Sequence, residues 1–260
     1  MTFSLRREEQ VDIDQLLQLI QHSPGKAAQA LLATAAQNVV EAQLLLGQIL
    51  LDGRGIEQDP ALARTWFGIA ARQGSAMGHN MLGRCLEHGW GGQADLAAAA
   101  GHYRAAAAAG LDWGQYNLAN LLATGRGVGQ DHAAALHLYQ QAAHAGHAKS
   151  MNLLGRYLEQ GLACEADRHA AMHWYRLSAE AGDFRGQFSH AAILAEQGHM
   201  EQSLVWLQKA LEQGNGNFLR TAVASLEQAE QPQIQAMAGA YRQRLEQVSR
   251  QATESLHSRV

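Results

Sequence analysis

Apolar residues recur along this chain with helical spacing, and the whole pattern repeats every 36 residues. In each period a first segment carries two apolar side chains three positions apart, which share one face of an α-helix. Four periods show this stripe: Leu46 with Ile49, Leu82 with Cys85, Leu118 with Leu121, and Leu154 with Tyr157. A second segment follows each stripe and ends in a related phrase, "WFGIAARQG", "HYRAAAAAG", "LYQQAAHAG" or "WYRLSAEAG". The pattern therefore predicts two antiparallel helices per period.

Small residues mark both the ends and the contacts of these predicted helices. Glycine suits the left-handed position that ends a helix, and asparagine is the usual second choice. Asn38 precedes the second glycine column by one period, so we expect it to end a helix as well. The first glycine column is Gly53, Gly89, Gly125 and Gly161; the second is Gly74, Gly110, Gly146 and Gly182. A further column of small residues, which would let helix axes approach closely, is Ala42, Gly78, Gly114, Ser150 and Gly186.

The glycine-rich phrase "TGRGVGQD" at 124–131 raises the question of a phosphate-binding loop. The phrase returns as "DGRGIEQD" at 52–59, and in both places it follows the end of a predicted helix. A phosphate cradle instead follows a strand and opens a helix. We therefore interpret these phrases as turns between helices, with Asp59, Asp131 and Asp167 capping the helices that follow.

The repeat divides the chain into three parts. Residues 1–38 contain a short-looped half-match and are expected to cap the first unit. Five units follow at 39–74, 75–110, 111–146, 147–182 and 183–214, the last with its loop shortened to "QGHME". Residues 215–260 are expected to form a further helix pair and a charged terminal helix, because a stack of repeats needs a polar end.

Composition agrees with an all-α protein and excludes several functions. Hydrophobic residues make up 47% of the 260 residues, while there are only three prolines and 6% aromatics. The net charge of -4 supplies no basic field for nucleic acid. No apolar run approaches the ~20 residues of a membrane span, and the N-terminus lacks a secretory signal. With only two cysteines, we expect a cytoplasmic protein without disulfides or structural zinc.

Histidines are the one candidate for hidden chemistry. His169 and His173 lie four positions apart, and His137 occupies the column of His173 one period earlier. The column is a polar one, and neither carboxylates nor cysteines accompany it with the spacing of a metalloenzyme. No nucleophile elbow, carboxylate cluster or nucleotide fingerprint occurs either. We therefore expect no catalytic residues, no metal site and no cofactor.

The stretch "GQYNLANLLATGRGVGQDHAAALHLYQQAAHAG" resembles a Sel1-like repeat, a relative of the tetratricopeptide repeat with a longer loop between its helices. The stretches that begin "AQLLLGQILLDGRG" and "KSMNLLGRYLEQG" match similarly, so the resemblance covers about residues 39–214. It implies a right-handed α-solenoid of stacked helix pairs. It also implies an adaptor that offers a concave groove, lined by the first helix of each repeat, to a protein or peptide.

The sequence itself indicates which residues would face that groove. Opposite the buried stripe lie two columns, two positions before it and two positions after it. The earlier column reads Leu44, Asn80, Tyr116, Asn152 and Phe188, and the later one reads Gln48, Arg84, Asn120, Arg156 and Ala192. Amides, guanidinium groups and aromatic rings suit recognition of an extended peptide. The predicted partner-binding residues are Asn80, Arg84, Trp113, Tyr116, Asn120, Asn152 and Arg156.

Two alternatives remain open at this point. Asn80, Tyr116 and Asn152 could instead join neighbouring repeats, since amides inside repeat proteins often do so. At the level of function, relatives have been linked to cell-wall or β-lactam chemistry, which would imply a small-molecule or metal-dependent activity. A self-assembling structural solenoid is a third hypothesis, whereas the adaptor hypothesis implies a monomer or weak dimer.

Overall fold

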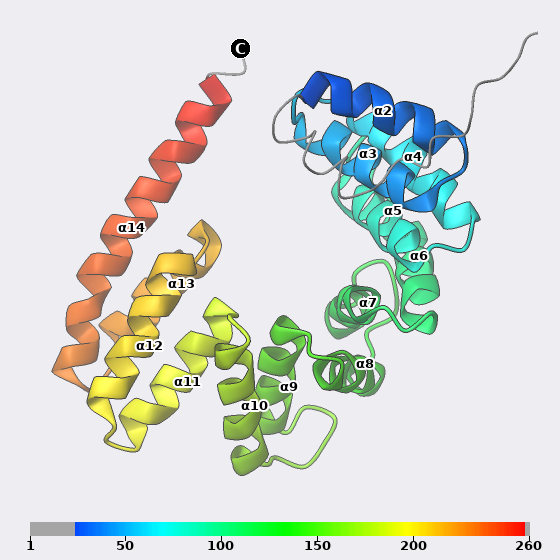
Figure 1. The fold of residues 1–260 in the computed structure, drawn as a ribbon. Coiled ribbons are helices and arrows are strands. Elements are labelled where there is room, and N and C mark those ends of the chain that lie inside the picture. Colours follow the sequence, from blue (N-terminus) through cyan, green and yellow to red (C-terminus); the bar gives the residue numbers. More distant parts are fainter. Residues whose placement is uncertain (1–23, 258–260) are drawn as a thin grey trace, which may run out of the picture. The chain divides into compact units, whose positions relative to one another are not determined.

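The computed structural model describes residues 24–257, and within this range every regular element is an α-helix (Figure 1). The predicted all-α fold is confirmed for these residues, and none of their helices is long and apolar enough to cross a bilayer. The helices are α2 (Pro24–Ala36), α3 (Val40–Asp52), α4 (Pro60–Arg72), α5 (Ala76–His88), α6 (Leu96–Ala108), α7 (Asp112–Thr124), α8 (His132–His144), α9 (Ala148–Gln160), α10 (Arg168–Glu180), α11 (Phe184–Glu196), α12 (Met200–Gln213), α13 (Gly216–Glu227) and α14 (Pro232–His257).

The chain forms two compact units, residues 1–131 and residues 132–260. In the first unit α3 packs on α4 and α5 on α6; in the second, α9 packs on α10 and α11 on α12. Each of these pairs is the two-helix repeat that the 36-residue pattern predicts. The buried stripe is also confirmed: Leu46, Cys85, Leu121, Leu154 and their partners are buried, apart from Leu82, which is half-buried.

Helix ends follow the predicted capping residues. The carboxylates of Asp59 and Asp167 accept hydrogen bonds from the backbone N–H of Leu62 and Ala170, each at 2.9 Å. All four glycines of the first column are left-handed, with φ between 65° and 70°, and end the first helix of their repeat. Asn38 is left-handed too, with φ 65°. The Gly-Arg-Gly phrases are therefore helix-ending turns, as predicted.

Small residues allow the helices to approach closely at two kinds of contact. A Cβ built on Gly78 of α5 would lie 2.6 Å from the backbone nitrogen of Ala71, so α5 presses directly on the end of α4. A Cβ on Gly83 would lie 2.7 Å from the ring of Tyr103, and one on Gly155 would lie 2.7 Å from the ring of Tyr175. Each aromatic ring of a second helix thus lies against a glycine of its own first helix.

The long connection inside a repeat covers the preceding repeat. In the first unit, a Cβ on Gly91 would lie 2.2 Å from the carbonyl oxygen of Pro60, and one on Gly127 would lie 2.4 Å from the Cβ of Leu96. Pro60 and Leu96 are the first residues of α4 and α6. The loops at 89–95 and 125–131 therefore rest on the beginning of the second helix one repeat earlier.

The fifth unit lacks this cover because its helices are joined by residues 197–199 alone. At the corresponding place, Arg168, the first residue of α10, forms an ion pair with Glu196 at the end of α11. A side-chain contact on the surface thus stands where the longer repeats place a loop.

The two ends of the chain differ from expectation in different ways. Of the predicted cap at 1–38, residues 1–23 lie outside the described residues, and α2 is its described helix. At the other end, the expected helix pair plus terminal helix is wrong: α13 and α14 form the pair, and α14 is itself the charged terminal helix. Gly239 does not interrupt α14, because its exposed position in the helix strains neither backbone nor packing.

The close approach at Gly78 makes a quantitative prediction. Gly78→Ala should destabilise the protein by about 1–3 kcal/mol, because the added methyl meets backbone atoms that cannot move independently. Gly101→Ala is the matched control: Gly101 lies within α6, a methyl added there would have no atom within 4 Å, and the variant should gain about 0.5–1 kcal/mol. Chemical denaturation followed by circular dichroism measures both changes, and equal effects would contradict the packing argument.

Candidate functional site

The predicted partner-binding residues fall on the first helices of three successive repeats, α5, α7 and α9. We call the surface that the first helices present within each unit the first-helix face of that unit. Five of them belong to the unit of residues 1–131 and two, Asn152 and Arg156, to the unit of residues 132–260. We describe the two groups separately.

Asn80 joins two repeats of the first unit. Its side chain is 3% exposed, and its Oδ1 accepts a hydrogen bond of 2.8 Å from Nδ2 of Asn117 on α7. An amide buried in this way contributes to stability chiefly because leaving it unpaired would be costly. For Asn80 the structure thus places the side chain between repeats, which was the alternative interpretation of this residue.

Asn152 repeats the arrangement in the second unit. It is 8% exposed, and its Oδ1 accepts a 3.2 Å hydrogen bond from the hydroxyl of Ser189 on α11. Both bonds span 37 residues, one more than the repeat period, so each asparagine is joined to the residue that follows its equivalent on the next first helix. The two asparagines hold the first helices in register and so position the more exposed residues beside them.

Arg84 lies one turn after Asn80 on α5 and is half-buried. Its guanidinium group stacks over the ring of Trp90, 5.1 Å from the ring centroid, and its Nη1 lies 3.6 Å from the sulfur of Met81. Stacking on an aromatic ring leaves the edge of the guanidinium available for a carboxylate. The ring of Trp90 and the sulfur of Met81 therefore both support the observed orientation of the Arg84 guanidinium group.

An aromatic pair occupies the first-helix face of α7. The indole of Trp113 is 38% exposed, a large value for a tryptophan, and it meets the ring of Tyr116 edge to face at 6.1 Å. Asn120, one turn further along α7, is half-buried. Exposed aromatic side chains of low conformational entropy are typical anchors of protein interfaces.

Arg156 occupies the column of Arg84 two repeats later, but its surroundings differ. It is exposed, and it lies close enough to Tyr157 and Tyr175 for its positive charge to lower the pKa of both phenols. Burial dominates and raises the pKa of each phenol above its usual value. Arg156 thus supplies a cation at the surface without the tryptophan platform that orients Arg84.

Two carboxylates near these arginines accept hydrogen bonds from tyrosine hydroxyls within the fold. The hydroxyl of Tyr103 donates to Glu87, and that of Tyr175 donates to Glu159, both at 2.8 Å. Glu87 also pairs with Arg126 at 3.2 Å. These contacts link the end of each first helix to its second helix, so neither carboxylate is placed to act as a free acid or base.

The cysteine in the buried stripe is equally unsuited to chemistry. Cys85 is fully buried, and desolvation raises the pKa of its thiol to about 11. A nucleophilic cysteine needs a lowered pKa and access to substrate. Cys85 therefore acts as a core residue.

Histidines gather at the uncovered end of α10, where the loop of the fifth unit is shortened. His169 and His173 line a hollow of about 430 Å³ together with Arg176, His190 and His199. His137 is exposed on α8, where it meets the amide of Gln141 at 3.0 Å. Among the described residues, no three histidine, cysteine, aspartate or glutamate side chains converge closely enough to hold a metal ion.

A histidine pair that the sequence did not single out lies between α5 and α6. The Nδ1 atoms of His79 and His102 are 3.0 Å apart, so one ring must donate and the other accept. Burial, followed by the proximity of His79, lowers the pKa of His102. The pair is stable only while at least one ring is neutral.

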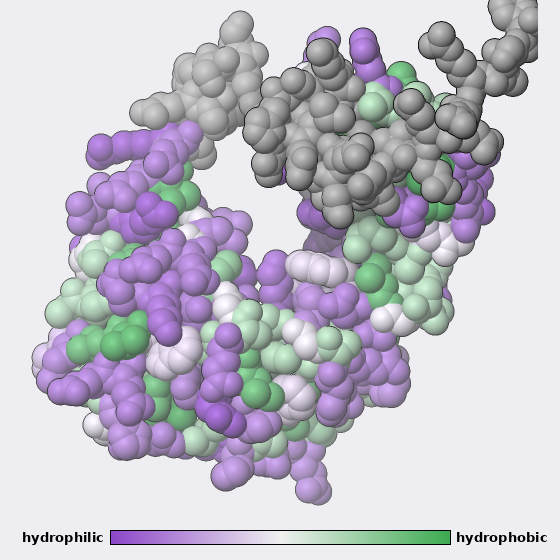
Figure 2. All heavy atoms as spheres, in the orientation of Figure 1, coloured by the Kyte–Doolittle hydropathy of each residue, from purple (hydrophilic) through white to green (hydrophobic). Residues whose placement is uncertain are grey.

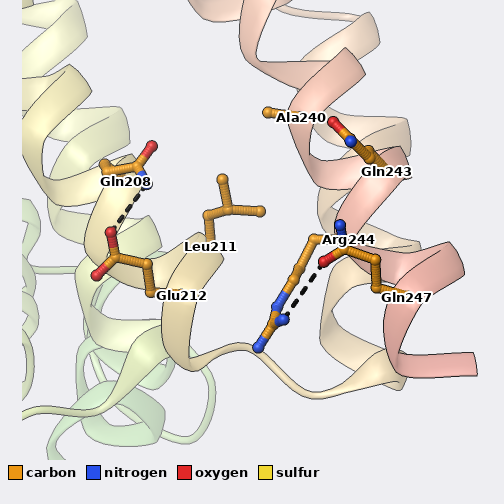
Figure 3. A pocket seen from close by; sticks show the side chains of 7 residues that line it. All are labelled: Gln208, Leu211, Glu212, Ala240, Gln243, Arg244 and Gln247. Atoms are coloured by element: carbon orange, nitrogen blue, oxygen red, sulfur yellow. Dashed lines mark hydrogen bonds between the residues drawn. The ribbon is translucent and has the colours of Figure 1, made fainter. Parts of the chain in front are cut away.

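Two further hollows open in the second unit. Figure 3 shows one of about 410 Å³ between α12 and α14, where Gln208 bonds to Glu212 and Arg244 to Gln247. Gln208 and Glu212 pair along α12 at 2.9 Å, whereas Nε of Arg244 is buried without a hydrogen-bond partner among the described residues. Figure 2 shows the wider context: polar residues cover most of the face in view, with apolar patches between them.

The other hollow lies beside the ends of α11 and α13 and has a volume of about 370 Å³. We call it the α11–α13 pocket. Phe188 and Ala192, which continue the two columns of the first-helix face, contribute to its wall. Sequence reasoning placed both residues on that face but could not detect the pocket, because its other walls come from α12, α13 and α14.

Comparison with known proteins identifies the repeat. A family model described as Sel1 repeat matches residues 40–75, 76–111, 114–147, 148–183 and 200–215. A Sel1 repeat protein from Oxalobacter formigenes is 23% identical, with a TM-score of 0.75 over 89% of this chain and 99% of that one. The likeness in structure confirms the predicted α-solenoid fold. The comparison with curated proteins found no match.

Two other solved structures are similar over most of this chain. A protective antigen of uropathogenic Escherichia coli, described as displaying an SLR fold, is 30% identical with a TM-score of 0.66, over 85% of this chain and 48% of that one. An immunity protein from Pseudomonas aeruginosa is 13% identical with a TM-score of 0.55, over 80% of this chain and 81% of that one. The same architecture therefore occurs in proteins with different roles.

The hydrogen bond between Asn80 and Asn117 predicts a measurable coupling. Asn80→Ala should lower the free energy of unfolding by about 1–3 kcal/mol, because the amide of Asn117 loses its partner at a half-buried site. Asn117→Ala and the double variant complete a double-mutant cycle in urea denaturation. We expect the double variant to lose clearly less stability than the two single losses combined. Additive losses would show that the bond contributes nothing to repeat stacking.

The histidine pair predicts how stability depends on pH. The folded state favours neutral His102, so the unfolded state binds more protons as the pH falls below about 6.5. Stability should therefore decrease from pH 7.5 to pH 5.5, and His102→Gln should reduce that decrease. His137→Gln, at an exposed site, is the control and should keep the wild-type slope. Identical slopes for all three proteins in denaturant titrations at each pH would disprove the role of the pair.

Proposed function

The chain belongs to the Sel1 repeat family, and on that basis we propose that it is a non-catalytic adaptor that binds a protein or peptide segment on its first-helix face. The observation that carries the proposal is the pair Trp113 and Tyr116, an aromatic cluster kept partly exposed on α7. Burying an aromatic side chain stabilises a fold, so aromatic pairs that stay partly exposed are typical of surfaces that bind a partner.

Two arginines, one in each unit, add polar recognition. Arg84 is held on Trp90 and can present two parallel N–H groups to a carboxylate or a peptide carbonyl. Arg156 brings a second cation from the other unit. The contribution of the asparagines is indirect, because their hydrogen bonds fix the register of the first helices that carry these arginines. The residues are Asn80, Asn117 and Asn152.

The chemistry of the chain favours binding over catalysis. Cys85 is buried with a raised pKa, and Glu87 and Glu159 are occupied by tyrosine hydroxyls. The acidic net charge of -4 disfavours nucleic acid as the partner. We place the protein in the cytoplasm as part of the same proposal.

An affinity capture experiment tests the proposal. The wild-type chain and an Arg84→Ala, Tyr116→Ala, Arg156→Ala triple variant are immobilised and exposed to the native cell extract. We expect a protein retained by the wild type to be at least tenfold less abundant on the triple variant, because three side chains proposed to contact it are removed. Quantitative mass spectrometry of the eluates measures the ratio.

The control variant carries three changes away from this face: His137→Ala, Glu212→Ala and Gln243→Ala. It should retain the same protein as the wild type, and circular dichroism must show equal helicity for all three chains. A protein bound equally by the wild type and the triple variant, or lost from the control instead, would move the binding surface elsewhere.

A further inference from the structure

The α11–α13 pocket combines an apolar floor with an acidic rim. Phe188, Leu207, Leu226 and Ile234 line it, and Leu207, Leu226 and Ile234 are themselves buried. Glu196, at the end of α11, also lines the pocket, and it is exposed. A floor of this kind offers dispersion contacts to an inserted side chain, and water would leave it readily.

The rim of the pocket carries two carboxylates, one of which is already paired with a cation outside the lining. Glu230, in the connection between α13 and α14, is the second exposed carboxylate of the lining, and none of the described lining residues is basic. Outside the lining, Arg168 pairs with Glu196, and Arg242 pairs with Glu227. Glu196 thus already accepts a guanidinium group, while Glu230 has no ion pair among the described residues.

Short connections border the pocket. The helices around it are joined by residues 197–199 and 228–231, whereas earlier repeats use 53–59, 89–95, 125–131 and 161–167. No long loop therefore follows α11 or α13, and Glu196 at the end of α11 and Glu230 after α13 line the pocket.

We infer that the α11–α13 pocket receives an arginine or lysine side chain from the partner segment, with its methylene stem on the apolar floor and its charge at Glu230. A long basic side chain buries its stem along apolar surface while its charged end stays at the rim. The volume of about 370 Å³ suits one or two side chains and is small for a larger ligand. This inference rests on the proposed function, because Phe188 and Ala192 belong to the face proposed to bind the partner.

A peptide selection tests the inference without knowledge of the natural partner. A phage-displayed library of random dodecapeptides is selected against the full chain, and enriched peptides are synthesised with a fluorescent label. We expect arginine or lysine, next to an apolar residue, to be enriched. Fluorescence polarisation should show at least a tenfold loss of affinity for a Glu230→Gln variant, which removes charge while keeping the size of the side chain and leaves the ion pair between Glu196 and Arg168 intact.

Glu212→Gln is the matched control, because Glu212 is a carboxylate of the same unit that lines the separate hollow of Figure 3. It should change the affinity by less than twofold. The inference is overturned if no peptide is enriched, if enriched peptides lack basic residues, or if basic peptides bind Glu230→Gln as tightly as the wild type. Peptides that bind Glu230→Gln normally but are lost on Arg156→Ala would overturn the pocket inference alone and leave the proposed function in place.

Discussion

The structure depends on the close approach of neighbouring helices at positions where a side chain has no room. Gly78, Gly114 and Gly186 each lie at the start of a first helix and press on the end of the second helix before it. Because a methyl group added at any of them would fall within 3 Å of that helix, the spacing between repeats is fixed by backbone contact. This contact fixes the positions of the first helices and therefore of the side chains on them. The amides of Asn80 and Asn152 add hydrogen bonds between successive first helices.

Loop length determines where such a stack is open to ligands. In the first unit, Gly91 and Gly127 let long loops rest on the beginning of α4 and α6, and left-handed glycines are needed there because any Cβ would clash. The fifth unit has lost this loop, and both the histidine-lined hollow and the α11–α13 pocket lie beside the remaining short connection. A short connection in one repeat thus coincides with hollows beside it, while the helix pair of that repeat is kept.

Much of the fold could be predicted from the sequence because it depends on helix capping and apolar spacing, and the same local pattern recurs in several repeats. The left-handed Asn38, the capping by Asp59 and Asp167 and the buried stripe follow from helix-end chemistry and spacing alone. The candidate site was less accessible. Column position placed Asn80 and Arg84 on one face, yet only side-chain geometry shows that Asn80 is paired with Asn117 while Arg84 stacks on Trp90. The α11–α13 pocket and the pair of His79 with His102 depend on contacts between elements, for which a single sequence carries no periodic signal.

Residues at equivalent positions of two repeats can have different surroundings, as Arg84 and Arg156 show. Arg84 and Arg156 occupy the same column of two repeats, but the position of Trp90 is taken by Leu162 in the later repeat. A guanidinium group stacked on an indole loses little freedom when it binds, whereas an exposed one must be ordered by the partner. Under the proposed function, Arg84 would contribute to selecting a partner by geometry and Arg156 to attracting it by charge. The same column of the repeat thus carries one arginine fixed by an indole and one left in solvent, because the residue six positions later differs.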